Sequence, residues 1–163
     1  MKNKMIAGAL AALIAWLALF CAGCGGSGAP DIDTVDLIGK MSEVCELPEM
    51  LTISTGDSRE QKGLAAISDM DIGKVAQYSL MYSADGSAYE LAVIRLKDES
   101  DVKAMEESLK KHIDSRVQQY KYYDSTQVSR AESAIVAVHG QYAALIMCDN
   151  SAEAREVFDK AFG

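Results

Sequence analysis

The chain has 163 residues, 49% of them hydrophobic and 25% charged, a balance that is typical of a single globular domain and excludes a disordered chain. Its 16 Lys and Arg residues are outnumbered by 24 Asp and Glu residues, which gives a formal charge of −8. A nucleic-acid-binding protein needs a basic surface that displaces counterions from phosphates, so this composition excludes nucleic acid as a partner.

The N-terminal residues have the pattern of a secretory signal. Two lysines lie within residues 1–4, and an apolar run without charge follows from Met5 to Phe20. This run has 16 residues, whereas a helix that spans a bilayer needs roughly 20. The prediction is therefore a signal segment at residues 1–23 that is removed after export, with an uncleaved anchor helix as the alternative.

A short motif at the end of this segment indicates lipidation. Ala22-Gly23-Cys24 resembles the lipobox of bacterial lipoproteins, in which the cysteine thiol is acylated with diacylglycerol before cleavage. The resemblance implies a mature protein that begins at Cys24, carries palmitate there, and is held on the outer face of the cell membrane. Two acyl chains give stable anchoring, at about 0.8 kcal/mol per buried methylene. Ordinary signal-peptidase cleavage stays open as an alternative, because Cys21 stands where an aliphatic residue is usual.

The mature chain is expected to consist of a tether and one domain. Residues 24–33 comprise the lipidated cysteine and a flexible, Gly-rich tether with a reach on the order of 15–20 Å. Residues 34–163 form the domain. Loss of Lys2 and Lys4 with the signal leaves 14 basic against 24 acidic residues. Anionic lipid headgroups repel such a chain, so its membrane affinity depends on the lipid.

The first part of the domain is predicted to contain two helices. Asp33 is placed to cap a helix that ends before Pro48. Residues 50–55 are expected to form a short extended stretch, and residues 59–67 a short helix weakened by Gly63.

The middle of the domain contains a predicted hairpin followed by a helix. Residues 75–83 and 88–96 are β-prone and flank Asp85-Gly86, a strong hairpin signal. From residue 97 to about residue 120, apolar residues recur every three or four positions, which predicts a long amphipathic helix.

The C-terminal part repeats this order. Residues 134–139 and 141–148 form a second predicted hairpin around Gly140, and Asn150 with Glu153 has the spacing of a capping box at the start of a last helix. The elements predict an α+β domain: a four-stranded antiparallel sheet from two hairpins, each followed by a helix, with the N-terminal helices packed on the sheet. The second hairpin is apolar on both faces, so either these helices cover the second face or a partner does, such as an envelope protein or a second copy of the chain.

The two hairpins also carry a family resemblance. The segment Tyr89–Asp98, the run Ala134–Val138, Gly140-Gln141-Tyr142, the lipobox and the closing helix are similar in pattern and order to the bacterial lipoproteins grouped as domain of unknown function 4358. The resemblance spans roughly residues 30–163 and implies a small extracytoplasmic lipoprotein. This family has no assigned activity, so the resemblance supplies no catalytic residues.

Few side chains in the sequence suggest chemistry. The two histidines are His112, in the long helix, and His139, at the tip of the second hairpin, whereas a zinc site needs three or four ligands. We therefore expect no catalytic, cofactor-binding or metal-binding residues and no cofactor. Cys45 and Cys148 either form a disulfide, as an exported protein allows, or are two small buried apolar residues.

One aromatic cluster is a possible partner surface. Tyrosine is enriched at interface cores, and Tyr120, Tyr122 and Tyr123 follow one another closely, although they can equally end the helix stripe and cover the sheet edge. The sequence thus favours a non-enzymatic lipoprotein that binds a protein or wall component at the cell envelope. The alternative is an envelope hydrolase that uses His112 or His139, in which one of these imidazoles would share a pocket with Asp, Glu or Tyr residues.

Overall fold

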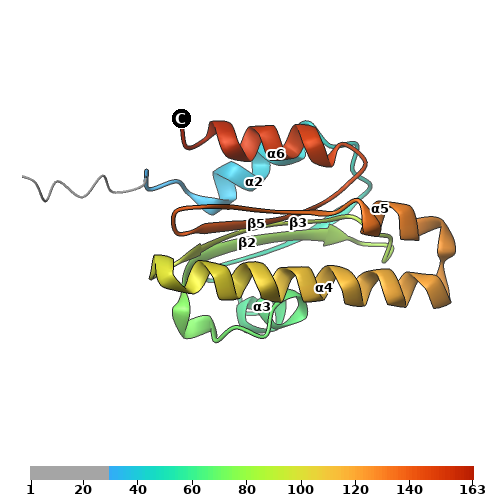
Figure 1. Ribbon diagram of the computed structural model, residues 1–163, viewed down its shortest axis with the longest axis horizontal. Coiled ribbons are helices and arrows are strands. Elements are labelled where there is room, and N and C mark those ends of the chain that lie inside the picture. Colours follow the sequence, from blue (N-terminus) through green and yellow to red (C-terminus); the bar gives the residue numbers. More distant parts are fainter. Residues whose placement is uncertain (1–29) are drawn as a thin grey trace, which may run out of the picture.

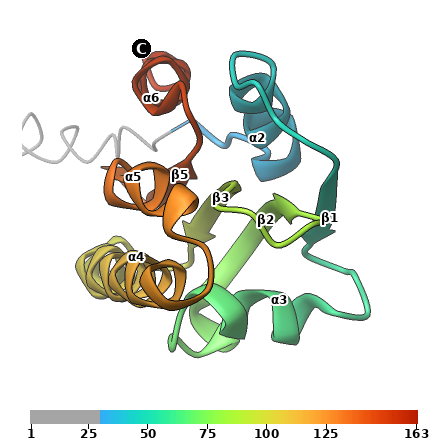
Figure 2. The ribbon, with the colours of Figure 1, turned by 90° about the vertical axis from the view of Figure 1, so that its right-hand side faces the viewer.

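A five-stranded antiparallel sheet with helices on both faces makes up residues 30–163, the part of the chain that the computed structural model describes. In chain order the helices are α2 (Thr34–Ser42), α3 (Glu60–Ile67), α4 (Val102–Tyr123), α5 (Val128–Glu132) and α6 (Ser151–Lys160), and the strands are β1 (Met50–Ser54), β2 (Val75–Ser83), β3 (Glu90–Leu96), β4 (Ile135–His139) and β5 (Tyr142–Met147). Figures 1 and 2 show α2 and α6 on one face of the sheet and α3 and α4 on the other. The α+β class is confirmed.

The sheet has five strands, so the expectation of four is wrong. The strand order is β1-β2-β3-β5-β4, and the extended stretch after α2 is the edge strand β1, which pairs antiparallel with β2. Only Ile53 of its five residues is fully buried. An edge strand that buries one side chain lacks the alternation by which a strand is identified in a sequence, and for that reason the sequence predicts only an extended stretch at this place.

The two predicted hairpins and the helix after each of them are confirmed. β2 pairs with β3 and β4 pairs with β5, both antiparallel. Gly86 in the first turn has a φ of 80° and Gly140 in the second a φ of 51°. Both values lie in the left-handed region that glycine adopts without steric cost, which explains why these turns need it. α4 follows the first hairpin and α6 the second.

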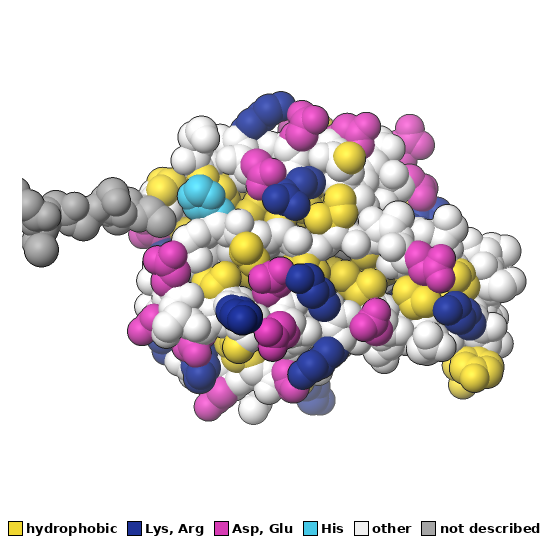
Figure 3. All heavy atoms as spheres, viewed as in Figure 1, with side chains coloured by type: hydrophobic (Ala, Val, Ile, Leu, Met, Phe, Trp, Pro, Cys, Tyr) yellow, Lys and Arg dark blue, Asp and Glu magenta, His cyan; other side chains and the backbone are white. Residues whose placement is uncertain are grey.

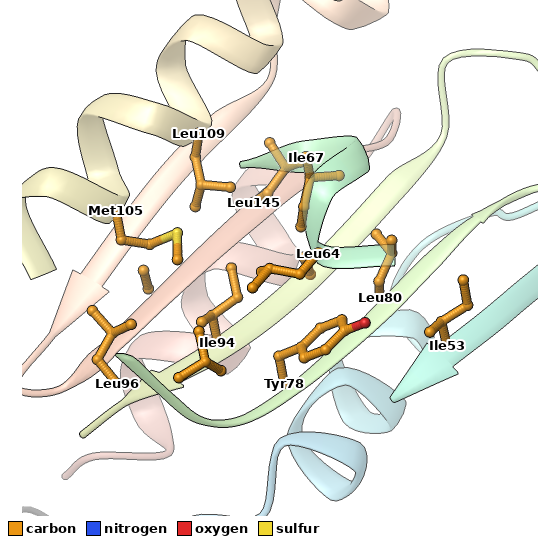
Figure 4. Packing of buried hydrophobic residues seen from close by; sticks show 13 residues of the cluster. Ile53, Leu64, Ile67, Tyr78, Leu80, Ile94, Leu96, Met105, Leu109 and Leu145 are labelled. Carbon is orange, nitrogen blue, oxygen red and sulfur yellow. The ribbon is translucent and has the colours of Figure 1, made fainter. Parts of the chain in front are cut away.

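Helices of the chain itself cover both faces of the sheet. Successive side chains of β5 point to opposite faces: Ala144 and Ile146 pack in the core under α2 and α6, whereas Ala143 and Leu145 pack in the core under α3 and α4. Figure 4 shows the second of these cores, where side chains from α3, α4 and the strands point toward one another. Ala143 and Leu145 are fully buried by helices of the chain itself, so the apolar second face needs no partner to cover it.

The predicted caps of the first and last helices have different outcomes. Asp33 caps α2 as expected, since its Oδ1 accepts hydrogen bonds from the backbone N–H groups of Val35 and Asp36 at 2.8 and 3.1 Å. The expected capping box at α6 is wrong, because the side chain of Asn150 makes no cap. Its Nδ2 instead donates to the carbonyl of Val44 at 3.2 Å, which ties the start of α6 to the segment after α2.

The last residues of the expected tether are bound to the domain. The backbone N–H of Ile32 donates to the Tyr142 hydroxyl at 2.8 Å, and that hydroxyl lies within hydrogen-bond distance of the carbonyls of Pro30 and Ile32. Asp31 forms an ion pair with Arg95. The expected signal at residues 1–23, Cys24 and the tether up to residue 29 lie outside the described residues. Within residues 30–163, no helix is both long and apolar enough to cross a membrane.

Candidate functional site

A cavity of about 690 Å³ lies between α3 and α4, on the face of the sheet opposite α2 and α6. This volume is in the range of sites that take a small molecule. Ile53, Leu80 and Tyr82 of β1 and β2 contribute to its lining from the sheet, together with the β2–β3 turn. α3 contributes Lys62, Gly63, Ala66 and Ile67, the segment before it contributes Arg59, and α4 contributes His112, Ser115, Arg116 and Gln119.

A buried carboxylate lies at the wall that α4 and the start of β3 share. Glu90 is 5% exposed, and its Oε2 lies 2.5 Å from Nε2 of His112, while its Oε1 lies 2.7 Å from Nε of Arg116. The alternation of β3 directs Glu90 toward α4, and His112 and Arg116, four positions apart, share one face of that helix. A carboxylate this deeply buried needs such partners, because an unpaired buried charge is strongly destabilising.

The contacts of Arg116 continue this cluster along the cavity wall. Its Nη1 donates to the side chain of Gln119 at 2.8 Å, and its Nη2 donates to the Tyr120 hydroxyl. That hydroxyl donates in turn to the carbonyl of Gly86 at 2.9 Å, and the guanidinium lies 4.6 Å from the centre of the Tyr120 ring. The wall formed by α4 and the β2–β3 turn is therefore fixed by charge-assisted hydrogen bonds.

Basic side chains outnumber acidic ones in the lining of the cavity. The lining contains three basic residues, Arg59, Lys62 and Arg116, and one acidic residue, Glu90. The carboxylate of Glu90 forms an ion pair with Arg116 within the wall. Arg59 donates to Asp57 at 3.0 Å and lowers the pKa of that carboxyl to about 2. Over the face shown in Figure 3, in contrast, basic and acidic side chains are intermingled. Arg116 and Arg59 of the lining are paired with Glu90 and Asp57, whereas Lys62 forms no ion pair among the described residues. A basic group of this kind in the lining, in a chain with a net charge of −8, favours an anionic ligand.

α3 lies very close to the sheet beside the cavity, and this close approach explains why a glycine, Gly63, stands in the helix although glycine weakens helices. A Cβ atom on Gly63 would lie 2.7 Å from the Tyr78 hydroxyl and 2.9 Å from Cγ2 of Ile53. The Tyr78 hydroxyl donates to the carbonyl of Glu60, and burial raises the pKa of Tyr78 to about 12. Gly63 thus allows α3 to rest on β1 and β2 with its axis close to the sheet.

The two histidines do not converge. His112 lies in the cavity wall, whereas the ring of His139 stacks on Phe162 near the C-terminus with ring centres 4.3 Å apart. Among residues 30–163, the His112 ring makes its hydrogen bond to Glu90, and no hydroxyl or thiol is hydrogen-bonded to it. The wall thus combines an imidazole and a carboxylate without a nucleophile in contact with them. Sequence reasoning selected His112 but missed Glu90 and Arg116.

The three tyrosines of the possible partner surface lie in different environments. Tyr120 is 4% exposed and belongs to the core under α5, so its ring is not available to a partner. Tyr122 and Tyr123 are each 85% exposed at the end of α4. The structure therefore leaves two of the three residues as a possible contact, and that contact stays a prediction.

The structure brings Cys45 and Cys148 together. Their sulfur atoms lie 2.7 Å apart, on the side of the sheet that α2 and α6 cover. Cys148 is buried at the end of β5, and Cys45 is half-buried after the end of α2. Within residues 30–163, no three His, Cys, Asp or Glu side chains are grouped so that they could hold a metal ion.

Comparisons with known proteins identify a family and nothing beyond it. The family model described as Domain of unknown function (DUF4358) matches residues 50–148. This segment begins at the first residue of β1 and ends just after β5, so it contains the whole sheet, α3, α4 and the cavity, and leaves out α2 and α6. The comparisons with curated proteins and with solved structures gave no match.

Proposed function

The chain belongs to the family described as Domain of unknown function (DUF4358), and we propose that it is an exported, lipid-anchored protein whose domain binds a small anionic ligand without catalysis. The observation that carries the binding proposal is the cavity of about 690 Å³ with apolar residues from the sheet and basic residues on its walls. The anchor proposal is supported by the signal pattern and by the lipobox-like Ala22-Gly23-Cys24.

The bound end of the tether determines how the domain would be held. The six-residue step from Cys24 to Pro30 spans at most about 20 Å. Asp31 and Ile32 contact Arg95 and Tyr142, which pair with each other at one end of β3 and β5. A lipid at Cys24 would therefore keep this end of the sheet close to the membrane.

The cavity wall lies at the opposite end of the same strands. Glu90 is the first residue of β3, and five residue steps, about 17 Å along a strand, separate it from Arg95. The wall made by Glu90 and the β2–β3 turn is thus directed away from the anchored end. An anchored domain in this orientation meets solutes outside the cell rather than lipid in the bilayer, which favours a soluble ligand.

The ligand proposed for this cavity combines an apolar body with an acidic group. The body would rest on Ile53, Ile67 and Leu80, and a carboxylate, phosphate or sulfonate would face Lys62 and Arg59. Glu90 does not oppose such a ligand, because His112 and Arg116 already hold both of its oxygens. Charge-assisted contacts would fix the orientation of the ligand, and burial of its apolar body would supply most of the affinity.

A fluorescent anion tests this proposal directly. Anilinonaphthalene sulfonate should bind the full chain, and Lys62→Glu should weaken its binding about tenfold, equivalent to about 1.4 kcal/mol. The matched control is Lys40→Glu, which reverses an exposed charge on α2, on the other face of the sheet. Phenylnaphthylamine, a neutral dye with a similar body, should be affected little by either change. Equal losses in the two variants would contradict the cavity as the anion site.

Lipidation has its own test. Cells grown with labelled palmitate should incorporate the label into the wild-type protein and not into Cys24→Ala, while Cys21→Ala should be labelled normally. The mass of the mature protein should correspond to a chain that begins at Cys24. Label on the Cys24→Ala variant, or a mature chain that begins elsewhere, would contradict the anchor and leave the cavity proposal intact.

The cavity wall also supports a second candidate, an envelope hydrolase that uses His112. The 2.5 Å contact between His112 and Glu90, in a solvent-open cavity, is the pairing that orients an imidazole as a general base. Hydrolysis of a chromogenic ester that is abolished by His112→Ala and unchanged in His139→Ala would establish this candidate. No turnover by either variant or by the wild type would leave binding as the function of the cavity.

A further inference from the structure

The segment after α2 meets the junction of β5 and α6 through two cysteines. The residues lie 103 positions apart in the sequence, yet their sulfur atoms are 2.7 Å apart, against about 2.05 Å in a disulfide bond. A second contact holds the same two segments together, the hydrogen bond from Asn150 to the carbonyl of Val44.

The surroundings of Cys148 favour its thiolate. The Cys45 thiol and the Ser151 hydroxyl hydrogen-bond to it, and together with the backbone N–H of Asn150 they lower the pKa of Cys148. The same contact raises the pKa of Cys45, with burial as the second cause. The sulfur of Cys148 is therefore suited to attack Cys45 in the second step of a disulfide exchange, once Cys45 is joined to an oxidant.

We infer that Cys45 and Cys148 form a disulfide bond in the exported protein, made by thiol–disulfide exchange with an oxidised dithiol partner outside the cell. Only the oxidising location rests on the export part of the proposed function; the pairing rests on the placement of the two side chains. The bond joins the segment after α2, the first element after the tether, to the end of β5, an inner strand of the sheet.

The exchange proceeds through the accessible sulfur. Cys45, the half-buried residue, attacks the disulfide R–S–S–R of the oxidant, forms the mixed disulfide Cys45–S–S–R and releases one R–S⁻. Cys148 then attacks the Cys45 sulfur and displaces the second R–S⁻. The protons of the two protein thiols pass to the two released thiolates, so two protein thiols are oxidised and one disulfide of the oxidant is reduced.

The experiment maps the thiols of the full chain isolated from whole cells, so that it does not depend on membrane attachment. Alkylation without reductant, digestion and mass spectrometry should give one linked peptide pair that contains Cys45 and Cys148. Alkylation of both residues before reduction would overturn the inference, whether or not Cys24 carries lipid. The same mass spectrum shows separately whether the peptide that contains Cys24 carries lipid. A missing disulfide can therefore be distinguished from a missing anchor.

Thermal unfolding supplies a second readout. Closure of a loop of this length should raise Tm by about 10 °C, so reductant should lower the Tm of the wild type by that amount. Cys45→Ala and Cys148→Ala should each have the Tm of the reduced protein and show no response to reductant. A wild-type Tm that is insensitive to reductant, in protein whose Cys45 alkylates freely, would overturn the inference as well.

Discussion

The two sides of the sheet share the same strands but are closed in different ways. On the side of α2 and α6, aromatic rings meet, with Phe162 lying 5.1 Å from Phe158 and 5.0 Å from Tyr142 between ring centres. On the side of α3 and α4, the helices stand apart over a cavity, and a buried ion cluster around Glu90 forms part of its wall. The first side is thus closed by apolar packing, and the second keeps the cavity to which we assign ligand binding in our proposal.

The strongest test of this division removes an aromatic ring from the closed side. Phe158 is fully buried, and Phe158→Ala should reduce the free energy of unfolding by about 3–5 kcal/mol, through lost burial and the cavity left behind. Urea unfolding measures the change. Tyr122→Ala, at an 85% exposed position, is the control and should change stability by less than about 0.5 kcal/mol.

The same variant also tests the independence of the two sides. Under conditions where Phe158→Ala is still folded, its affinity for anilinonaphthalene sulfonate should equal that of the wild type, because Phe158 packs on the face away from the cavity. A large loss of affinity in the folded variant would show that the two sides are coupled through the sheet.

A smaller effect on stability is expected when the same change, glycine to alanine, is made in two helices on opposite sides of the sheet, α3 and α2. Gly63→Ala places a methyl group 2.7 Å from the Tyr78 hydroxyl and should destabilise the protein by about 1–3 kcal/mol. Gly39→Ala, in α2, meets nothing within 4 Å and should stabilise by about 0.5–1 kcal/mol, because alanine favours a helix over glycine. Thermal unfolding of both variants measures the contrast.

Opposite signs for the two glycines would confirm that α3 lies closer to the sheet than a side chain at position 63 allows. Stabilisation by both substitutions would mean that α3 can lift away from β1 and β2, and that the cavity changes shape easily. In that case the affinity of Gly63→Ala for the anionic dye would shift as well.

Local signals explain how much of this architecture the sequence could predict. The turns at Gly86 and Gly140 and the cap at Asp33 depend on residues close in sequence, and all three are found as predicted. Because β5 is apolar on both faces, its sequence indicated that both faces of the sheet are covered. The pattern alone could not tell whether helices of the chain or a partner cover the second face. What failed depended on contacts between distant segments: β1 is defined by its pairing with β2, and Asn150 binds Val44 instead of capping α6.

The candidate site was less accessible to sequence reasoning for the same reason. Glu90 and His112 are 22 positions apart, in a strand and a helix that meet only in the folded chain. One signal was present, because Glu90 is an acid at the start of β3, a strand that is apolar apart from Glu90 and Arg95, and a carboxylate buried there needs a partner. His112 and Arg116, one helical turn apart, were the available partners. Cavity shape, in contrast, depends on how far α3 and α4 stand apart, which no local pattern encodes.

The smallest predicted effect is the pH-dependent stability contributed by two acidic residues, Asp33 before α2 and Asp98 before α4, on the two sides of the sheet. The side chain of Gln77 donates to Asp33 at 2.7 Å and, with the backbone N–H groups of Asp36 and Val35, lowers the pKa of Asp33. A carboxyl whose pKa is lower in the folded than in the unfolded protein adds stability above its unfolded pKa of about 3.9, and loses it as the pH falls through the folded value. Asp33→Asn should therefore cost about 0.3–1 kcal/mol at pH 7 and progressively less as the pH falls below about 3.9.

Asp98→Asn, at the turn before α4, is the matched comparison. Asp98 accepts a hydrogen bond from the backbone N–H of Ser100 at 2.8 Å, and its pKa is also lowered, by its hydrogen bonds with Ser100. Among the described residues it makes no contact with the sheet equivalent to that between Asp33 and Gln77. Its pH-dependent contribution should be smaller than that of Asp33, as measured by Tm between pH 2 and pH 7. Equal contributions would mean that Gln77 adds nothing, and that the closed side is held by its aromatic rings and its paired cysteines rather than by the cap at the end of the tether.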